Sequence, residues 1–322
     1  MLSVYVPQGA SLQRITAVPG EPLPDGAVWI DMVSPTSQED KLAESLFGIA
    51  VPTREEMQEI EVSSRLYVEN GARYMTATLM CHSDTMTPKT TPVTFILAGH
   101  RLVTVRYDEP RPFAIVEHKL ARNCSPKVTG ESVMIDLIDA VIDRSADILE
   151  RIAAEVDQVS HSIFEPDIET PDYKDVLKAL GRKGDLTSKV RESLVSIGRV
   201  LLFLHNEAET LKWAKDTRAH LQSMRRDTAS LSDHATYLAN KITFLLEAML
   251  GVVNLEQNAI IKIFSIAAVI FMPPTLVASI YGMNFHHNMI ELDWEYGYPF
   301  ALIVILLAGV LPIVFFKWKK WL

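Results

Sequence analysis

Two long uncharged stretches near the C-terminus constrain this chain of 322 residues more than any other feature. Residues 263–281 and 297–316 contain no Asp, Glu, Lys or Arg. Each is about 20 residues long, which is the length an α-helix needs to cross a bilayer. Two buried helices of a large soluble core are the alternative, but the chain before them is too polar to cover them. We therefore predict two transmembrane helices.

The charges around these stretches predict their orientation. Basic residues lie before the first stretch and after the second: Lys262, Lys317, Lys319 and Lys320. The intervening loop, residues 282–296, has no Lys or Arg but has three acidic residues: Glu291, Asp293 and Glu295. Because basic residues stay on the cytoplasmic side, we place both termini, including the basic segment 317–322, in the cytoplasm and the loop outside.

Residues 1–125 predict a cytoplasmic α/β domain. Runs rich in β-formers lie at 3–6, 27–32, 73–81, 92–97 and 102–106. Residues 98–101 form a plausible hairpin turn, and Thr53 with Glu56 fits a capping box at the start of a helix. The domain has no glycine-rich phosphate loop, nucleophile elbow or HExxH motif, so we predict no enzyme.

Residues 126–262 predict long helices, because apolar residues recur at spacings of three and four from about residue 131. Prolines interrupt this pattern at 165–172, a second helix covers about 173–209, and a third begins near 218. The third has a coiled-coil-like apolar seam: Leu231, Ala235, Leu238, Ile242, Leu245, Met249 and Val252. Continued to residue 281, this helix would be roughly 95 Å long. Its cytoplasmic part would be a stalk whose bare seam needs partner chains, so we predict an oligomer.

Composition excludes two further classes of protein. The net charge of −9 argues against nucleic acid as a partner, because phosphates call for a basic surface. The two cysteines, Cys81 and Cys124, exclude a disulfide scaffold and fit a reducing compartment. The N-terminal residues lack the pattern of a signal peptide.

One face of the first uncharged stretch is small or polar. Its positions are Asn258, Ile261, Ser265, Ala268, Met272, Thr275, Ser279 and Gly282. A helix-packing stripe and the lining of a water-filled pore both explain such a face. Pro273 and Pro274 free the carbonyls of Val269 and Ile270, which indicates either a kink or oxygen atoms available to a hydrated cation. The absence of ionisable groups favours a passive path, along which a divalent ion gains about 4.6 kcal/mol per 100 mV.

The end of this stretch reads Tyr281-Gly282-Met283-Asn284-Phe285. Here the chain resembles the CorA family of magnesium and cobalt transporters, whose signature is Gly-Met-Asn at the outer end of the penultimate helix. Residues 59–65, 254–258 and 316–322 are also similar to family members. The resemblance implies an α+β fold with stalk helices and two C-terminal spans, assembled as a funnel-shaped homopentamer in the bacterial inner (plasma) membrane. It also implies channel-type uptake of Mg²⁺, with Co²⁺ or Ni²⁺ as further cargo, gated by cytoplasmic Mg²⁺.

The resemblance assigns roles to individual residues. Gly282, Met283 and Asn284 would form the selectivity loop. Asn258, Met272 and Thr275 would face the pore, with Ile261 and Phe264 at its hydrophobic constriction. Glu247 would help bind regulatory Mg²⁺ between subunits. A ring of Asn284 carbonyls would accept hydrogen bonds from the waters of Mg²⁺, which gives up its water reluctantly. A helix C-cap is the alternative for Asn284, and Gly282 permits backbone conformations closed to other residues.

The loop after the signature departs from many family members, because it lacks their Met-Pro-Glu-Leu sequence. His286 and His287 stand there instead, either as ligands for Ni²⁺, Co²⁺ or Zn²⁺ or as solvated residues. The acidic residues Glu291, Asp293 and Glu295 would raise the local cation concentration. A zinc transporter similar to ZntB and a non-transporting membrane-anchored sensor with a coiled-coil stalk remain alternative functions.

Overall fold

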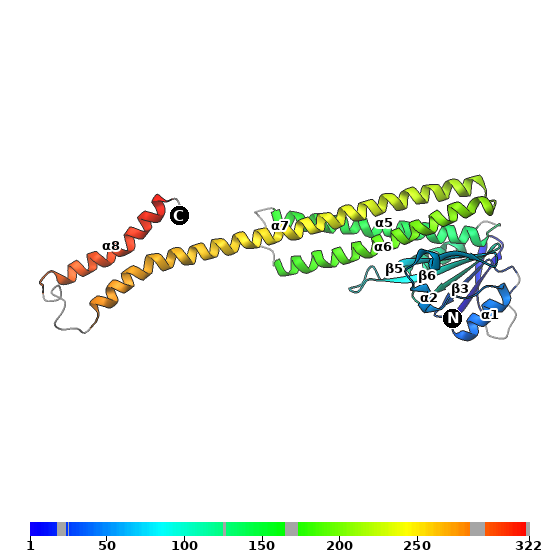
Figure 1. The fold of residues 1–322 in the computed structure, drawn as a ribbon, viewed down its shortest axis with the longest axis horizontal. Helices are drawn as coiled ribbons and strands as arrows, with labels where there is room; N and C mark the ends of the chain where they lie inside the picture. The colour runs from blue at the N-terminus through cyan, green and yellow to red at the C-terminus, as the bar shows by residue number, and fades with distance from the viewer. Residues whose placement is uncertain (18–23, 25, 125–126, 165–172, 284–293, 320–322) are drawn as a thin grey trace. The chain divides into compact units, whose positions relative to one another are not determined.

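The computed structural model describes residues 1–17, 24, 26–124, 127–164, 173–283 and 294–319. Its elements (Figure 1) are β1 (Leu2–Gln8), β2 (Ser11–Thr16), β3 (Trp29–Val33), α1 (Ser37–Phe47), α2 (Arg54–Met57), α3 (Val62–Arg65), β4 (Leu66–Glu69), β5 (Ala72–Cys81), β6 (Lys89–Ala98), β7 (Arg101–Arg106), α4 (Arg111–Arg122), α5 (Gly130–Phe164), α6 (Tyr173–Thr210), α7 (Lys215–Tyr281) and α8 (Gly297–Trp318). Two compact units, Met1–Leu246 and Glu247–Leu322, divide the chain.

The first unit contains a seven-stranded sheet with the order β2-β1-β3-β7-β6-β5-β4. All neighbours are antiparallel except β3 and β7, which run parallel. The predicted turn between β6 and β7 is confirmed, with Gly99 at a φ of 59°. The sequence analysis missed β2 and β4. For β4 a signal was present, since Asn70 and Gly71, with φ values of 51° and 81°, form the Asn-Gly turn that favours a hairpin.

Helices cover both faces of this sheet, because successive strand residues point to opposite sides. Trp29 and Phe95 belong to the core beneath α4, α5 and α6. Their neighbours Ile30 and Ile96 belong to the core on the α1 and α2 side. The capping box predicted at Thr53 is confirmed, and it starts α2 on that second face.

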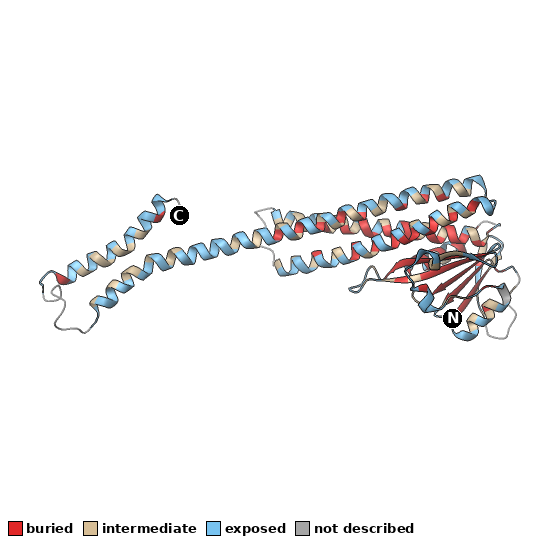
Figure 2. Cartoon of the chain, viewed as in Figure 1, coloured by how far each residue is buried: buried red, intermediate tan, exposed pale blue. Residues whose placement is uncertain are grey.

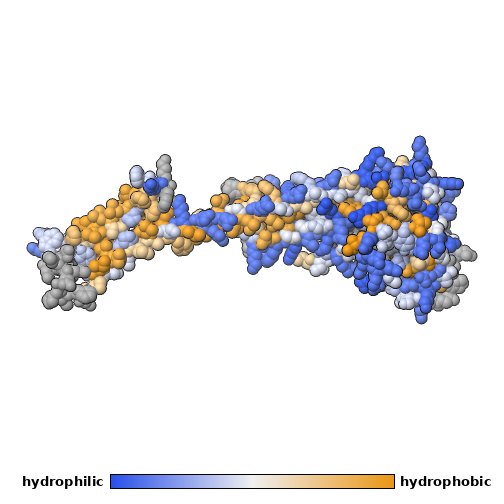
Figure 3. Space-filling model, viewed as in Figure 1, coloured by the Kyte–Doolittle hydropathy of each residue, from blue (hydrophilic) through white to orange (hydrophobic). Residues whose placement is uncertain are grey.

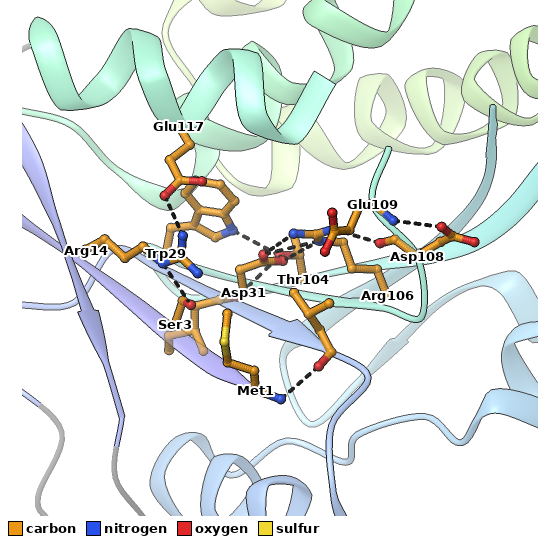
Figure 4. Close-up of polar contacts among 12 residues, drawn as sticks. Met1, Ser3, Arg14, Trp29, Asp31, Thr104, Arg106, Asp108, Glu109 and Glu117 are labelled. Atoms are coloured by element: carbon orange, nitrogen blue, oxygen red, sulfur yellow. Dashed lines mark hydrogen bonds and ion pairs between the residues drawn. The ribbon is translucent and has the colours of Figure 1, made fainter. Parts of the chain in front are cut away.

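A buried ion pair joins the two parallel strands at the middle of the sheet (Figure 4). Arg106 on β7 donates to both carboxylate oxygens of Asp31 on β3, and the distance from Nη2 to Oδ2 is 2.8 Å. The Thr104 hydroxyl donates to Asp31 Oδ1 at 2.7 Å and accepts from Trp29 Nε1 at 3.0 Å. Asp31 is 3% exposed and Arg106 9%, so these hydrogen bonds replace the water that both charges have lost.

The helices α5, α6 and α7 form a bundle within the first unit (Figure 1). The apolar seam of α7 is buried here, as Figure 2 shows in red, with Ala235, Leu238, Ile242 and Leu245 against α5 and α6. The prediction that this seam needs partner chains is therefore wrong for these residues. Its partners are long helices of the same chain, whose matching faces the sequence analysis did not pair with it.

The second unit holds the two predicted spans. The α7 helix continues without a break through Pro273 and Pro274 to Tyr281, and α8 covers the second uncharged stretch. Of their most apolar windows, 0% is buried in α7 and 6% in α8. Figure 3 shows this hydrophobic surface in orange over the end of α7 and over α8. Exposure on this scale argues against two buried helices of a soluble core and agrees with membrane spans.

Candidate ion-conduction face

The end of α7 has one face that contacts α8 and an opposite face that is exposed. The half-buried residues of this segment are Ile266, Ala267, Ile270, Pro273, Pro274, Val277 and Tyr281. The small or polar stripe predicted from the sequence is exposed: Asn258, Ile261, Ser265, Ala268, Met272, Thr275 and Ser279. At about 100° per residue the two sets are centred about 180° apart around the helix. The stripe therefore does not pack against α8, although packing between separate chains stays open.

A close approach between the spans explains why the prolines lie on the covered face. A Cβ atom at Gly309 would lie 3.3 Å from Pro274 Cγ and 4.0 Å from the carbonyl oxygen of Ile270. Small residues let membrane helices approach in this way. The carbonyl of Ile270, freed by Pro274, thus faces α8 and not the exposed stripe. The sequence analysis did not single out Gly309, because several small residues along α8 are equally plausible contacts.

The stripe presents hydrogen-bond acceptors to its surroundings. The Thr275 hydroxyl donates its proton to the carbonyl of Phe271 at 2.7 Å, so its lone pairs point outward. A hydrated cation presents the hydrogen atoms of its water shell, and acceptors are the groups that can bind them. Ser265, Ser279 and Asn258 add further neutral oxygens on this face.

The Gly-Met-Asn signature begins where α7 ends. The Gly282 amide donates to the carbonyl of Ala278 at 2.9 Å, and the Met283 amide donates to Ile280 at 3.3 Å. Gly282 has no positive φ. A Cβ atom there would instead lie 3.1 Å from the carbonyl oxygen of Ala278, which is a tight contact. Asn284 lies outside the described residues.

The remaining predicted site residues are placed only in part. Glu247 is exposed on α7, and Glu295 is exposed just before α8. The side chains of Ile261 and Phe264, at the expected constriction, are 60% and 72% exposed. His286, His287, Glu291 and Asp293 lie outside the described residues. Among the residues that the structure describes, no three His, Cys, Asp or Glu side chains gather to hold a metal ion.

These features define an integral membrane protein with two C-terminal spans and a large polar N-terminal portion. The chain belongs to the family described as CorA-like Mg²⁺ transporter protein, which it matches over residues 24–320. It is 34% identical over 322 residues to the magnesium transport protein CorA of Escherichia coli strain K12, and the match covers all of both chains.

Solved structures share the fold at low sequence identity. The complete structure of the CorA magnesium transporter from Methanocaldococcus jannaschii matches with a TM-score of 0.76 at 16% identity, and covers 100% of this chain and 99% of that chain. The ZntB cytoplasmic domain from Vibrio parahaemolyticus matches with a TM-score of 0.58 at 9% identity, and covers 78% of this chain. At these identities the likeness concerns the fold alone.

Proposed function

We propose that this protein is a channel for Mg²⁺ uptake, in which α7 helices of several copies surround the pore. The observation that carries the proposal is the uncharged, exposed stripe on α7 opposite the face that contacts α8. When copies assemble around an axis with α8 outside, that stripe is the face that meets the axis. Family membership, and 34% identity to a magnesium transport protein, support Mg²⁺ as the cargo. The assembly we propose is the homopentamer that the resemblance implies.

The chemistry of the stripe suits an ion that keeps its water shell. Mg²⁺ dehydrates reluctantly, and neutral oxygens such as Thr275 Oγ1 and a ring of Asn284 carbonyls accept hydrogen bonds from its waters without replacing them. A ring of carboxylates would hold a divalent ion more tightly and slow its exit. The membrane potential then drives the ion inward. Co²⁺ and Ni²⁺ are proposed as further cargo, and His286 and His287 as their outer contacts.

Gating by cytoplasmic Mg²⁺ is proposed through Glu247. An exposed carboxylate on α7 can bind Mg²⁺ between neighbouring copies. Dissociation of this Mg²⁺ would let the acidic subunits repel one another. Ile261 and Phe264 would close the pore, because a narrow apolar constriction excludes water and ions. Both termini are proposed to be cytoplasmic and the membrane to be the bacterial inner membrane.

The central test is Mg²⁺ uptake into proteoliposomes. We expect wild-type uptake to be blocked by cobalt hexaammine, a mimic of hydrated Mg²⁺, and to be strongly reduced by Asn284→Ala and by Ala268→Phe. Leu306→Phe is the matched control, since Leu306 is a 65% exposed position on α8. Equal uptake by Ala268→Phe and Leu306→Phe vesicles would refute the assignment of the pore face.

Two further measurements separate the alternatives. If Glu247→Ala vesicles keep wild-type sensitivity to internal Mg²⁺, the gating role of this residue is wrong. Zn²⁺ flux that is accelerated by a proton gradient would favour a zinc transporter similar to ZntB. A purified protein that passes no divalent cation would favour a membrane-anchored sensor.

A further inference from the structure

A basic pocket lies in the first unit, far along the sequence from the membrane spans. It has a volume of about 560 Å³ and lies between α3, β5 and α6. Three arginines line it, Arg65, Arg191 and Arg199, with Glu192 as the one acidic residue of the lining. Three guanidinium groups and one carboxylate leave two positive charges uncompensated. The whole chain carries a net charge of −9, so the pocket is positively charged although the chain as a whole is acidic.

The three arginines are held together by the fold. Arg191 and Arg199 lie eight residues apart on α6, which places them on the same face of the helix. Arg65 is fixed by hydrogen bonds to the carbonyl of Glu59 and, at 3.0 Å, to Thr78 Oγ1. The Thr78 amide in turn donates to Ser196 Oγ of α6 at 2.8 Å. The pocket is therefore built on paired elements of the core.

The electrostatics of the pocket favour the binding of an anion. Burial, with the positive charge of Arg199 next in effect, lowers the pKa of Arg65. Within the described part of the chain, Arg191 and Arg199 make no ion pair. Elsewhere in the same unit, Arg144 and Arg151 both bind the carboxylate of Asp84. Glu192 offsets only part of this positive charge. Like charges gathered in one place are costly, and a bound anion would reduce that cost.

We propose that this pocket binds a small organic phosphate, a molecule with two or more phosphate groups and an apolar or aromatic part. The guanidinium fork matches phosphate oxygens in a bidentate manner. Ile60, 84% exposed, and Val195, 40% exposed, give the pocket an apolar wall beside the arginines. The volume is in the range of ligand sites, roughly 300–1,000 Å³, and exceeds the needs of one phosphate ion. A nucleoside triphosphate combines these properties.

The test is calorimetric titration of the detergent-solubilised full chain in EDTA, so that Mg²⁺ binding does not contribute. The probes are ATP, tripolyphosphate and adenosine. We expect ATP to bind more tightly than tripolyphosphate and adenosine not to bind. Arg199→Gln should weaken ATP binding by at least about tenfold, since it removes charge-assisted hydrogen bonds. Arg226→Gln, which removes the same charge at an exposed position of α7 outside the pocket, should change the affinity by less than about twofold.

Other results would overturn the proposal. Val195→Ser should weaken ATP binding but not tripolyphosphate binding, and equal affinities for both probes would refute the organic part of the ligand. Equal losses of ATP affinity in Arg199→Gln and Arg226→Gln would show that ATP is held by non-specific electrostatic attraction and not by the pocket. Absence of ATP binding, together with a lower oligomer mass for Arg191→Glu by light scattering, would assign the pocket to an acidic segment of a second copy. Thermal unfolding of each variant checks that the fold is kept.

Discussion

Cysteine substitutions on α7 test directly which face of this helix meets water. Ser265→Cys and Ala268→Cys place thiols on the exposed stripe, and Ala267→Cys and Ile270→Cys place them on the face toward α8. Each stripe position is two residues from its control, so the members of a pair lie about 160° apart at nearly the same membrane depth. Depth and local sequence are thereby matched, and the direction in which the thiol points is the main difference.

The native cysteines give a low background in this experiment. Both are buried, and burial raises the pKa of Cys124 and raises that of Cys81 to about 12. The thiolate is the reactive form. At pH 7.5 a solvated thiol with a pKa near 8.5 is about one-tenth ionised, so Cys81 has a roughly 3,000-fold smaller thiolate fraction. Thiols that face lipid or α8 are also poorly ionised, because neither environment solvates the anion.

The assay is the rate of modification by a cationic, membrane-impermeant methanethiosulfonate reagent, read by mass spectrometry and by loss of Mg²⁺ uptake. We expect Ser265→Cys and Ala268→Cys to react at least about a hundredfold faster than their partners and to lose uptake on modification. Added Mg²⁺ should slow the reaction by competing for the path. If Ala267→Cys and Ile270→Cys react as fast as Ser265→Cys and Ala268→Cys, the assignment of the faces is refuted.

Three further predictions concern the first unit. Arg106→Met should destabilise the sheet by about 3–5 kcal/mol, because it leaves the Asp31 carboxylate buried without its partner. Adding Asp31→Leu should recover most of that loss. Hydrogen exchange of the β3 and β7 amides measures the stability of both variants. Gly130→Ala should cost about 1–3 kcal/mol by overpacking, since its Cβ would lie 2.4 Å from a backbone nitrogen of β7, and a lowered melting temperature checks this. The Arg151 hydrogen bond lowers the pKa of Asp84, so its stabilising effect is present above the ordinary carboxyl range and is lost as pH falls through the lowered pKa. The melting temperatures of wild type and Asp84→Asn should therefore differ at pH 6 and converge in strong acid.

Much of the fold follows from local patterns in the sequence. The helix predicted for 173–209 is α6, Tyr173–Thr210, and the helix expected from near 218 is α7, which begins at Lys215. These predictions succeed because a long amphipathic helix repeats its pattern many times. The strand β2 was missed because its six residues alternate weakly, with only Leu12 buried.

Pairings between distant segments were harder to predict. The pattern of α7 reveals that Leu238 and Ile242 need a partner, but it does not tell whether that partner is another chain or α5 and α6. The ion pair of Asp31 and Arg106 spans 75 positions, and no local pattern joins them. The pocket of Arg65, Arg191 and Arg199 likewise depends on the contact between β5 and α6, and the spacing of the two α6 arginines was its only trace in the sequence.

The two parts of α7 use the same helical geometry for different purposes. From Leu231 to Leu245 the apolar seam is satisfied by the chain's own α5 and α6. From Ile266 to Tyr281 one face is half-buried toward α8, and the opposite face exposes the hydroxyls of Thr275 and Ser279. In a single copy the Thr275 hydroxyl donates to the carbonyl of Phe271, but lipid offers no donor to the lone pairs of its oxygen. In the proposed channel, assembly of several copies around a water-filled axis would supply these donors, so the exposed stripe is the face that we expect to meet the hydrated path.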